Sequence, residues 1–153
     1  MTLVASTHSR TVAAAENYTI GDIVSNSASN GAGTPWQFSN VGSFGYIRGG
    51  VITCTEDSIT TLFRLHLFTA SPTASELDDN VALAIAEADR GAYIGFVDFP
   101  AMVDVGVPSV SQTEVLKPFT GLGTLYGILE DRSGETAETA AQTISITLYV
   151  EKV

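Results

Sequence analysis

Residues Ile59–Ser71 read ITTLFRLHLFTAS and form the densest apolar run in the chain. Successive side chains of a strand point to opposite faces of its sheet, so one face of this stretch carries Phe63, Leu65, Leu67 and Thr69. The other face carries Leu62, Arg64, His66 and Phe68. Apolar side chains on both faces, interrupted by one Arg and one His, predict a strand in the middle of a sheet, buried on one side and partly covered on the other.

The preceding segment, Phe44–Thr55 (FGYIRGGVITCT), is also strand-like and contains the pair Gly49-Gly50. Paired glycines inside a strand are typical of a β-bulge, or of another backbone that approaches closely. Glu56-Asp57-Ser58 predicts a turn between the two segments. We therefore expect Phe44–Ala70 to form a hairpin, with Ile59–Ala70 as its second strand.

Further strand-like segments are spread over the rest of the chain: Asp22–Ser25, Trp36–Val41, Tyr93–Phe99, Thr113–Phe119, Thr124–Glu130 and Gln142–Lys152. The composition of Val81–Asp89 predicts one or two turns of helix. Connections near residues 71–92 and 100–112 are too long for hairpins. The pattern predicts an all-β fold, a jelly-roll-like antiparallel β-sandwich of about eight strands with at most one short helix, rather than an up-and-down barrel.

The length of 153 residues suits one domain with a core of its own. Residues Met1–Asn17 are mostly small and polar, and predict an N-terminal arm that lies on the body of the domain or on a neighbour. The body is expected to be a single β-sandwich domain over residues 18–153. The N-terminus has neither a basic segment nor a long apolar run, so we expect no signal peptide and synthesis in the cytoplasm.

The formal net charge is -10, and the 17 acidic residues are scattered along the chain. Such a charge repels nucleic-acid phosphates and anionic lipids, so we expect neither nucleic acid nor a membrane as a partner. Charged residues make up only 16% of the chain, against about 25% in a typical soluble domain. This predicts a polar, weakly charged surface that partners partly cover; a monomer with a surface rich in Thr and Ser is the alternative.

Residues that could carry chemistry are few. The chain has two histidines, His8 and His66, and one cysteine, Cys54. A metal site of the kind found in jelly rolls needs several histidines and a carboxylate, so we expect no metal, no cofactor and no catalytic residue. Cys54 is expected in the core, and His66 is expected to be a structural residue on a sheet face. A small β-sandwich enzyme remains an alternative, and it requires His66 in an open pocket beside a carboxylate.

Two other groups have both a structural and a functional interpretation. Asp78-Asp79-Asn80 offers oxygen ligands for Ca²⁺ but lacks the spaced acids of an EF-hand, which favours a solvated loop. An aromatic surface for sugar could be formed by Trp36, Phe38, Phe44 and Tyr46, but aromatic side chains more often belong to cores. A receptor- or glycan-binding module of a phage head or tail fibre is the second alternative, and it requires Trp36 to be accessible.

Several segments, in order, resemble a pattern in small structural proteins of tailed bacteriophages. They are Tyr18–Ser25 (YTIGDIVS), Trp36–Phe38 (WQF), Gly45–Gly50 (GYIRGG), Leu65–Phe68 (LHLF), Asp79-Asn80, Tyr93–Gly95 (YIG) and Leu125–Leu129 (LYGIL). The resemblance covers about residues 18–150 and implies a capsid decoration (cement) protein. Such a protein is a jelly-roll-like domain on the exterior of the virion capsid, often a homotrimer, whose partner is the major capsid protein. The family has no catalytic residues.

The resemblance implies a function by binding alone, because contacts across capsomer boundaries oppose expansion or splitting of the shell. Under this hypothesis the predicted arm reaches a neighbouring subunit or the capsid, and a disordered tail is the alternative. The residues expected to make capsid or subunit contacts are Leu3, Val4, His8, Arg10 and Val12.

Overall fold

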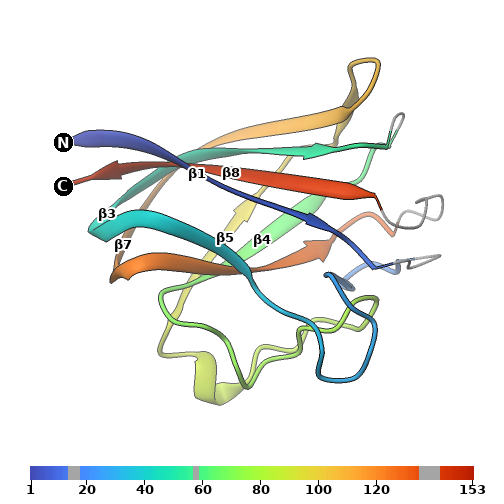
Figure 1. The fold of residues 1–153 in the computed structure, drawn as a ribbon, viewed down its shortest axis with the longest axis horizontal. Coiled ribbons are helices and arrows are strands. Elements are labelled where there is room, and N and C mark those ends of the chain that lie inside the picture. Colours follow the sequence, from blue (N-terminus) through green and yellow to red (C-terminus); the bar gives the residue numbers. More distant parts are fainter. Residues whose placement is uncertain (14–17, 57–58, 135–141) are drawn as a thin grey trace.

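The computed structural model describes residues 1–13, 18–56, 59–134 and 142–153 of the chain, which are almost entirely β-structure (Figure 1). Eight strands form one hydrogen-bonded antiparallel sheet. They are β1 (Thr2–Thr11), β2 (Ile23–Val24), β3 (Trp36–Cys54), β4 (Phe63–Phe68), β5 (Tyr93–Asp98), β6 (Val103–Asp104), β7 (Ser109–Asp131) and β8 (Thr143–Lys152). The all-β prediction is confirmed, and in the described residues no helix is long and apolar enough to cross a membrane.

The order of strands in the sheet is β1-β8-β3-β7-β4-β5, and the short strands β2 and β6 also pair with β7. The long strands β3 and β7 both turn back at one side of the molecule, so the single sheet folds into two layers (Figure 1). Gly42 of β3 lies opposite Gly123 of β7, and the ladder shifts register on both sides of Gly42. Their φ angles are +84° and +90°, values that glycine adopts without the cost a side chain would bring.

Each layer contains half of each long strand. The first layer consists of β1, β8, the C-terminal half of β3 and the N-terminal half of β7. The second consists of the N-terminal half of β3, the C-terminal half of β7, β4 and β5. The two bent strands therefore connect the layers through their own backbones, and the sandwich is one continuous sheet.

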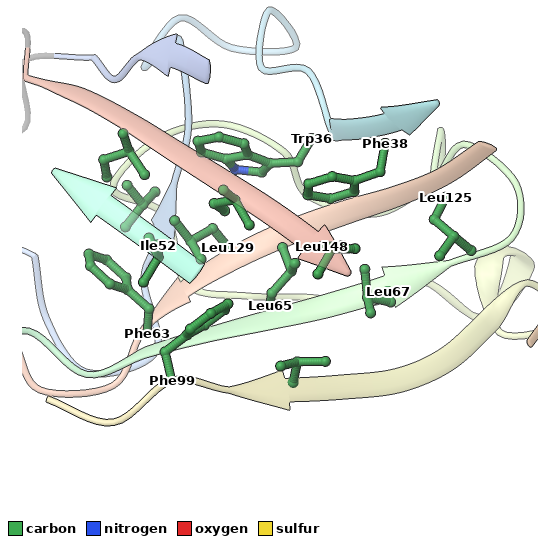
Figure 2. Packing of buried hydrophobic residues seen from close by; sticks show 14 of the residues in the cluster. Trp36, Phe38, Ile52, Phe63, Leu65, Leu67, Phe99, Leu125, Leu129 and Leu148 are labelled. Carbon is green, nitrogen blue, oxygen red and sulfur yellow. The ribbon is translucent and has the colours of Figure 1, made fainter. Parts of the chain in front are cut away.

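The hydrophobic core lies between the two layers (Figure 2). Trp36 and Phe38 project into it from β3, Leu65 from β4 and Leu148 from β8, and none of these side chains is more than 1% exposed. Burying a large apolar side chain contributes about 1.5–3 kcal/mol, so this cluster is the main source of stability. A smaller cluster on the other side of β4, around Ile23, Phe68 and Ile128, lies beneath the segment 71–92.

The prediction that Phe44–Ala70 forms a hairpin is wrong. β3 and β4 do not pair with each other but lie on opposite edges of β7, where Trp36 and Leu67 both have Gly127 as their partner. Alternation in a sequence identifies a strand but not its neighbour in the sheet. The strand itself is shorter than predicted and spans Phe63–Phe68, with apolar side chains buried on both faces as expected.

Two local predictions have different outcomes. The bulge at Gly49-Gly50 is confirmed: the register of β3 shifts between Ile47 and Gly49 against both neighbours, and a Cβ atom at Gly49 would collide with the carbonyl oxygen of Thr113. The prediction of one or two helical turns within Val81–Asp89 is confirmed in part: Glu87–Asp89 forms one 3-10 turn, and the residues before it are not helical.

The extended conformation of the segment that follows Asn80 has a backbone explanation. Leu83 N–H donates to the carbonyl of Gly21, and the Val81 carbonyl accepts from Ile23 N–H. Asp22 and Ala82 form a bridge between these two hydrogen bonds. These pairings with another segment satisfy backbone hydrogen bonds that a helix would otherwise have formed. The tertiary contacts therefore override the helix propensity of the segment.

The N-terminal segment, predicted to be an arm, lies on the body of the domain. Its residues Thr2–Thr11 form β1, which pairs along its whole length with β8, from Thr2 opposite Lys152 to Thr11 opposite Thr143. β1 is the edge strand of the first layer, and residues 14–17 fall outside the described ranges.

Candidate functional site

The five predicted contact residues fall into two groups in β1 and just after it. Leu3 points outward and is 64% exposed. Val4, His8 and Arg10 point the other way, toward the second layer, and their strand partners Val150, Ile146 and Ile144 are core residues. Val12, just beyond the strand, is buried in the core. Only Leu3 has the exposure expected of a contact residue on a docking face.

Arg10 is a cation held among neutral groups. Its Nη1 donates to the Thr34 carbonyl at 2.6 Å and to Asn26 Oδ1 at 3.4 Å, and its Nη2 donates to the Pro35 carbonyl at 2.6 Å. The guanidinium carbon lies 4.3 Å from the centre of the Trp36 ring, within range of a cation–π interaction. Burial lowers the pKa of Arg10 to about 10, so the side chain is charged at neutral pH.

His8 lies beside Arg10 on the same face of β1. Its Nδ1 accepts a hydrogen bond from the backbone N–H of Gln37 at 2.7 Å, so the neutral ring carries its proton on Nε2. The ring meets Trp36 edge-on, with 5.5 Å between centroids. Burial, and then the charge of Arg10, hold the pKa of His8 below its usual range. His8 is therefore a neutral donor next to a permanent cation.

His8 and Arg10 line an open pocket of about 530 Å³. The pocket also contacts residues from β3, from β7 and from the loops around them: Asn26, Thr34, Pro35, Gln37, Ser71 and Tyr126. These residues are distant in sequence, and β1, β3 and β7 bring them together at the side of the sandwich. Neither histidine spacing nor any local motif marks this pocket, because it depends on the tertiary arrangement.

His66 has a carboxylate partner that the sequence did not reveal. Its Nε2 lies 2.7 Å from Glu130 Oε2, and its Nδ1 lies 3.0 Å from the hydroxyl of Tyr93. The consistent assignment is a neutral ring that donates from Nε2 to Glu130 and accepts from Tyr93 at Nδ1. Burial holds the pKa of His66 below its usual range, although Glu130 acts in the opposite direction.

This chain of Tyr93, His66 and Glu130 resembles a catalytic triad in its connectivity, but its environment is structural. Burial raises the pKa of Tyr93, whereas an activated nucleophile needs a lowered one. His66 is 6% exposed and Glu130 is 7% exposed. Neither residue lines any of the three main surface pockets within the described ranges. Both side chains are thus largely shielded from solvent, whereas the enzyme alternative requires His66 in an open pocket.

Charged and aromatic side chains surround the hydrogen-bonded residues Tyr93, His66 and Glu130. Arg64 binds Asp98 through Nε at 2.6 Å and Nη2 at 3.0 Å, and lies 3.8 Å from the centre of the Phe96 ring. Arg132 lies 3.7 Å from the second oxygen of Glu130. Asp98 and Glu130 thus both have cationic neighbours, so the cluster is internally neutralised.

Asp78 and Asp79 tie loops together. Asp78 accepts hydrogen bonds from the backbone N–H groups of Gly33 at 2.8 Å and Gly31 at 2.7 Å, which lower the pKa of its carboxyl. Asp79 Oδ1 accepts from Tyr18 at 2.8 Å and from the backbone of Ser25 at 2.6 Å. Both are buried, contrary to the predicted solvated loop. Across the described part of the chain, no three His, Cys, Asp or Glu residues are grouped as a metal site.

The outer face of the first layer carries two cross-strand rows without a charged side chain. The first row is Thr7, Thr147, Val51 and Gln112. The second row is Ser9, Ser145, Thr53, Val110 and Val103. All of these side chains are exposed or half-buried. We call these nine residues the neutral face.

An open groove borders the neutral face. It has a volume of about 850 Å³, and its lining includes Leu3, Arg48, Val51, Leu116 and Tyr149. Leu3 and Leu116 are each 64% exposed, and Tyr149 is 38% exposed. The groove also contacts Glu114, and its Tyr149 and Arg48 are of residue types that are enriched at protein–protein interfaces.

Comparisons with known proteins give distant structural similarities. No protein-family model and no curated protein sequence matches the chain. Among solved structures, the globular domain of zebrafish complement 1qA is 10% identical with a TM-score of 0.36, covering 96% of both chains. The Eiger TNF structure from S. frugiperda is 12% identical with a TM-score of 0.37, covering 94% of this chain and 96% of that one.

A third similarity is to a larger protein. The CBM22-1–GH10 modules of xylanase 10B from Clostridium thermocellum are 12% identical with a TM-score of 0.35, over 96% of this chain. The chain spans 26% of the length of that protein. At these identities and TM-scores, the similarities do not assign the chain to a family or to an activity.

Proposed function

We propose that this protein is a non-catalytic structural protein of a phage virion, which binds the exterior of the capsid and stabilises the shell by bridging capsomers. The observation that carries the proposal is the neutral face. Nine cross-strand neighbours without a charge lie on the outside of a molecule whose formal net charge is -10. Depletion of charge distinguishes the centre of an interface from ordinary protein surface.

The local structure of the neutral face suits a rigid docking surface. Apart from Gln112, its side chains are short or β-branched, and hydroxyl pairs join β1 to β8: Thr7 to Thr147 at 2.8 Å and Ser9 to Ser145 at 2.7 Å. Short side chains lose little rotamer entropy when a partner covers them. The hydroxyl groups have further donor and acceptor capacity with which to bind the polar groups of a partner.

Repetition makes a modest interface effective. Many copies of one subunit on a symmetric shell present the same face in the same way, and a contact that crosses a capsomer boundary must break before the shell separates. We propose the major capsid protein as the partner and a homotrimer as the assembled form, in line with the sequence resemblance to cement proteins.

The two alternatives have less support in the described residues. A glycan-binding module built on Trp36 requires that side chain to be accessible, and it is 1% exposed beneath Arg10 and His8. A catalytic role for His66 requires access and an activated partner, but His66 is 6% exposed and burial raises the pKa of Tyr93. The neutral face, in contrast, is available on the surface.

Binding to phage heads tests the proposal. Purified protein is mixed with expanded heads that lack it, the heads are sedimented, and the bound protein is quantified. Saturable binding, with heads that then withstand higher temperature, is the expected result. Absence of binding to intact expanded heads would overturn the proposed role. The size of the protein in concentrated solution reports separately on the trimer.

A further inference from the structure

The pocket beside His8 and Arg10 has no role in the proposed docking. It lies on the inward side of β1, whereas the neutral face is on the outward side of the same strand. Its lining is polar, and its charge is opposite in sign to that of the whole protein. The pocket therefore has the properties of a second binding site, separate from the docking surface.

The first observation is an unbalanced charge. Every ion pair found in the described ranges involves other cations, and Arg10 has no carboxylate neighbour there. Three of its five N–H groups donate to Thr34, Asn26 and Pro35. Its buried Nε has no acceptor within the described structure. A buried cation that lacks a counter-ion is costly, so an anion that enters the pocket gains an attraction that no group in the described part of the chain provides.

The second observation is a set of donors around the same space. The neutral ring of His8 presents Nε2–H, because Nδ1 is already engaged by Gln37. Tyr126 and Ser71 also line the pocket, and within the described residues neither side-chain hydroxyl has a hydrogen-bond partner. Donors that converge on one cation form a site for a ligand with several acceptor oxygens.

We propose that this pocket binds the carboxylate of a small organic acid, with Arg10 as counter-ion and His8, Tyr126 and Ser71 as donors to the ligand's oxygens. A carboxylate fits better than a phosphate, because Arg10 is the only cation in the lining and the protein as a whole is strongly negative. A dianion would meet that field with one compensating charge. The carboxylate can belong to an acidic sugar or to an acidic amino acid, and the chemistry of recognition is the same.

The single tryptophan of the chain provides the readout. Trp36 contacts both Arg10 and His8, so its indole N–H signal in an NMR spectrum reports on the pocket. The intact protein is titrated with glucuronate, with the α-amide of N-acetylaspartate, which carries a single carboxylate, with glucose and with sodium chloride at matched ionic strength. We expect a saturable shift with at least one of the two carboxylates and a dissociation constant of about 1 mM or tighter. Glucose and chloride are expected to give none.

The two carboxylates distinguish the source of the ligand. Binding of glucuronate alone assigns an acidic sugar, binding of the α-amide of N-acetylaspartate alone assigns an amino-acid carboxylate, and binding of both assigns the carboxylate group itself. No saturable shift with either one would overturn the proposal. An equal response to glucose would also overturn it, because recognition would then not depend on charge.

Variants test the site at single groups. Tyr126→Phe removes one donor and keeps the ring, and it is expected to weaken binding several-fold. Tyr149→Phe, on the outer face, is the matched control and is expected to leave affinity unchanged. Arg10→Gln is expected to abolish binding. If that variant does not fold, the affinities of Tyr126→Phe and Tyr149→Phe for the carboxylate are compared instead. Equal affinity in these two tyrosine variants would contradict the assignment.

Discussion

The hydroxyl groups of Thr7 and Thr147 form a hydrogen bond of 2.8 Å across the edge strand β1 and its neighbour β8. Their pair is the start of the first neutral row, which continues through Val51 of β3 to Gln112 of β7. Four strands thus present uncharged side chains side by side. The same register that closes the sheet also builds the surface proposed to bind the capsid.

The exposed hydroxyl pair is expected to contribute little to stability. Replacing Thr7 by Ala removes an exposed hydrogen bond but opens no cavity, so the free energy of unfolding should fall by less than about 1 kcal/mol. Urea unfolding of Thr7→Ala beside the parent protein measures this. A loss of several kcal/mol would mean that the neutral face is a structural element rather than a free surface.

The bend of the two long strands depends on glycine. Gly123 has a φ of +90° with open space around its Cα, so a methyl group there meets no neighbour and the cost is conformational. We expect Gly123→Ala to lower the free energy of unfolding by about 1–2 kcal/mol. Gly91→Ala is the control, since Gly91 also has open space but an ordinary φ. Equal stability of the two variants, measured by thermal unfolding, would contradict this account of the bend.

The buried carboxyl of Asp79 predicts a pH effect. Burial raises the pKa of Asp79 to about 6 from 3.8, so the folded protein binds the proton more tightly than the unfolded chain. Stability from this group is present below about pH 4 and is lost as the pH rises through about 6, by up to about 3 kcal/mol. Asp79→Asn keeps the acceptor for Tyr18 and Ser25 and should flatten this part of the profile. Identical pH profiles of the two proteins would refute it.

His66 predicts an effect in the opposite direction. Its pKa is held below the usual 6.5 by burial, so the unfolded chain binds the proton more tightly and stability from His66 falls as the pH drops below about 6.5. At pH 7 the ring should be neutral with its proton on Nε2, which ¹⁵N chemical shifts can identify. His66→Gln should remove the pH effect and leave binding to phage heads intact. A charged ring at pH 7, or loss of head binding in a folded variant, would contradict the structural role.

Local sequence features predicted the parts of the fold that depend on neighbouring residues. Alternation identified the buried strand within Ile59–Ser71, and the glycine pair identified the bulge in β3. The segment Gln142–Lys152 was likewise identified as strand-like, and its residues Thr143–Lys152 form β8. These signals are strong because each depends on only a few residues.

Pairings between distant segments could not be predicted in this way. Nothing near Ile59–Ser71 indicates that its neighbour in the sheet is β7 rather than β3. In the sequence, Gly42 and Gly123 look like ordinary turn glycines, and nothing shows that they lie opposite each other at the bend. Glu130 reaches His66 only through that pairing. Arg10, in a segment that reads as polar and mobile, is buried because β1 pairs with β8.

The most direct test of the central claim places a charge in the neutral face. Thr147→Glu puts a carboxylate in the first row, and Thr73→Glu puts the same charge on an exposed residue in the segment 71–92. Both proteins are checked for folding by circular dichroism and then bound to expanded phage heads that lack the protein. Our account predicts that Thr147→Glu weakens binding at least tenfold, about 1.4 kcal/mol, while Thr73→Glu binds like the parent. Equal binding by both variants would show that the neutral face does not contact the capsid.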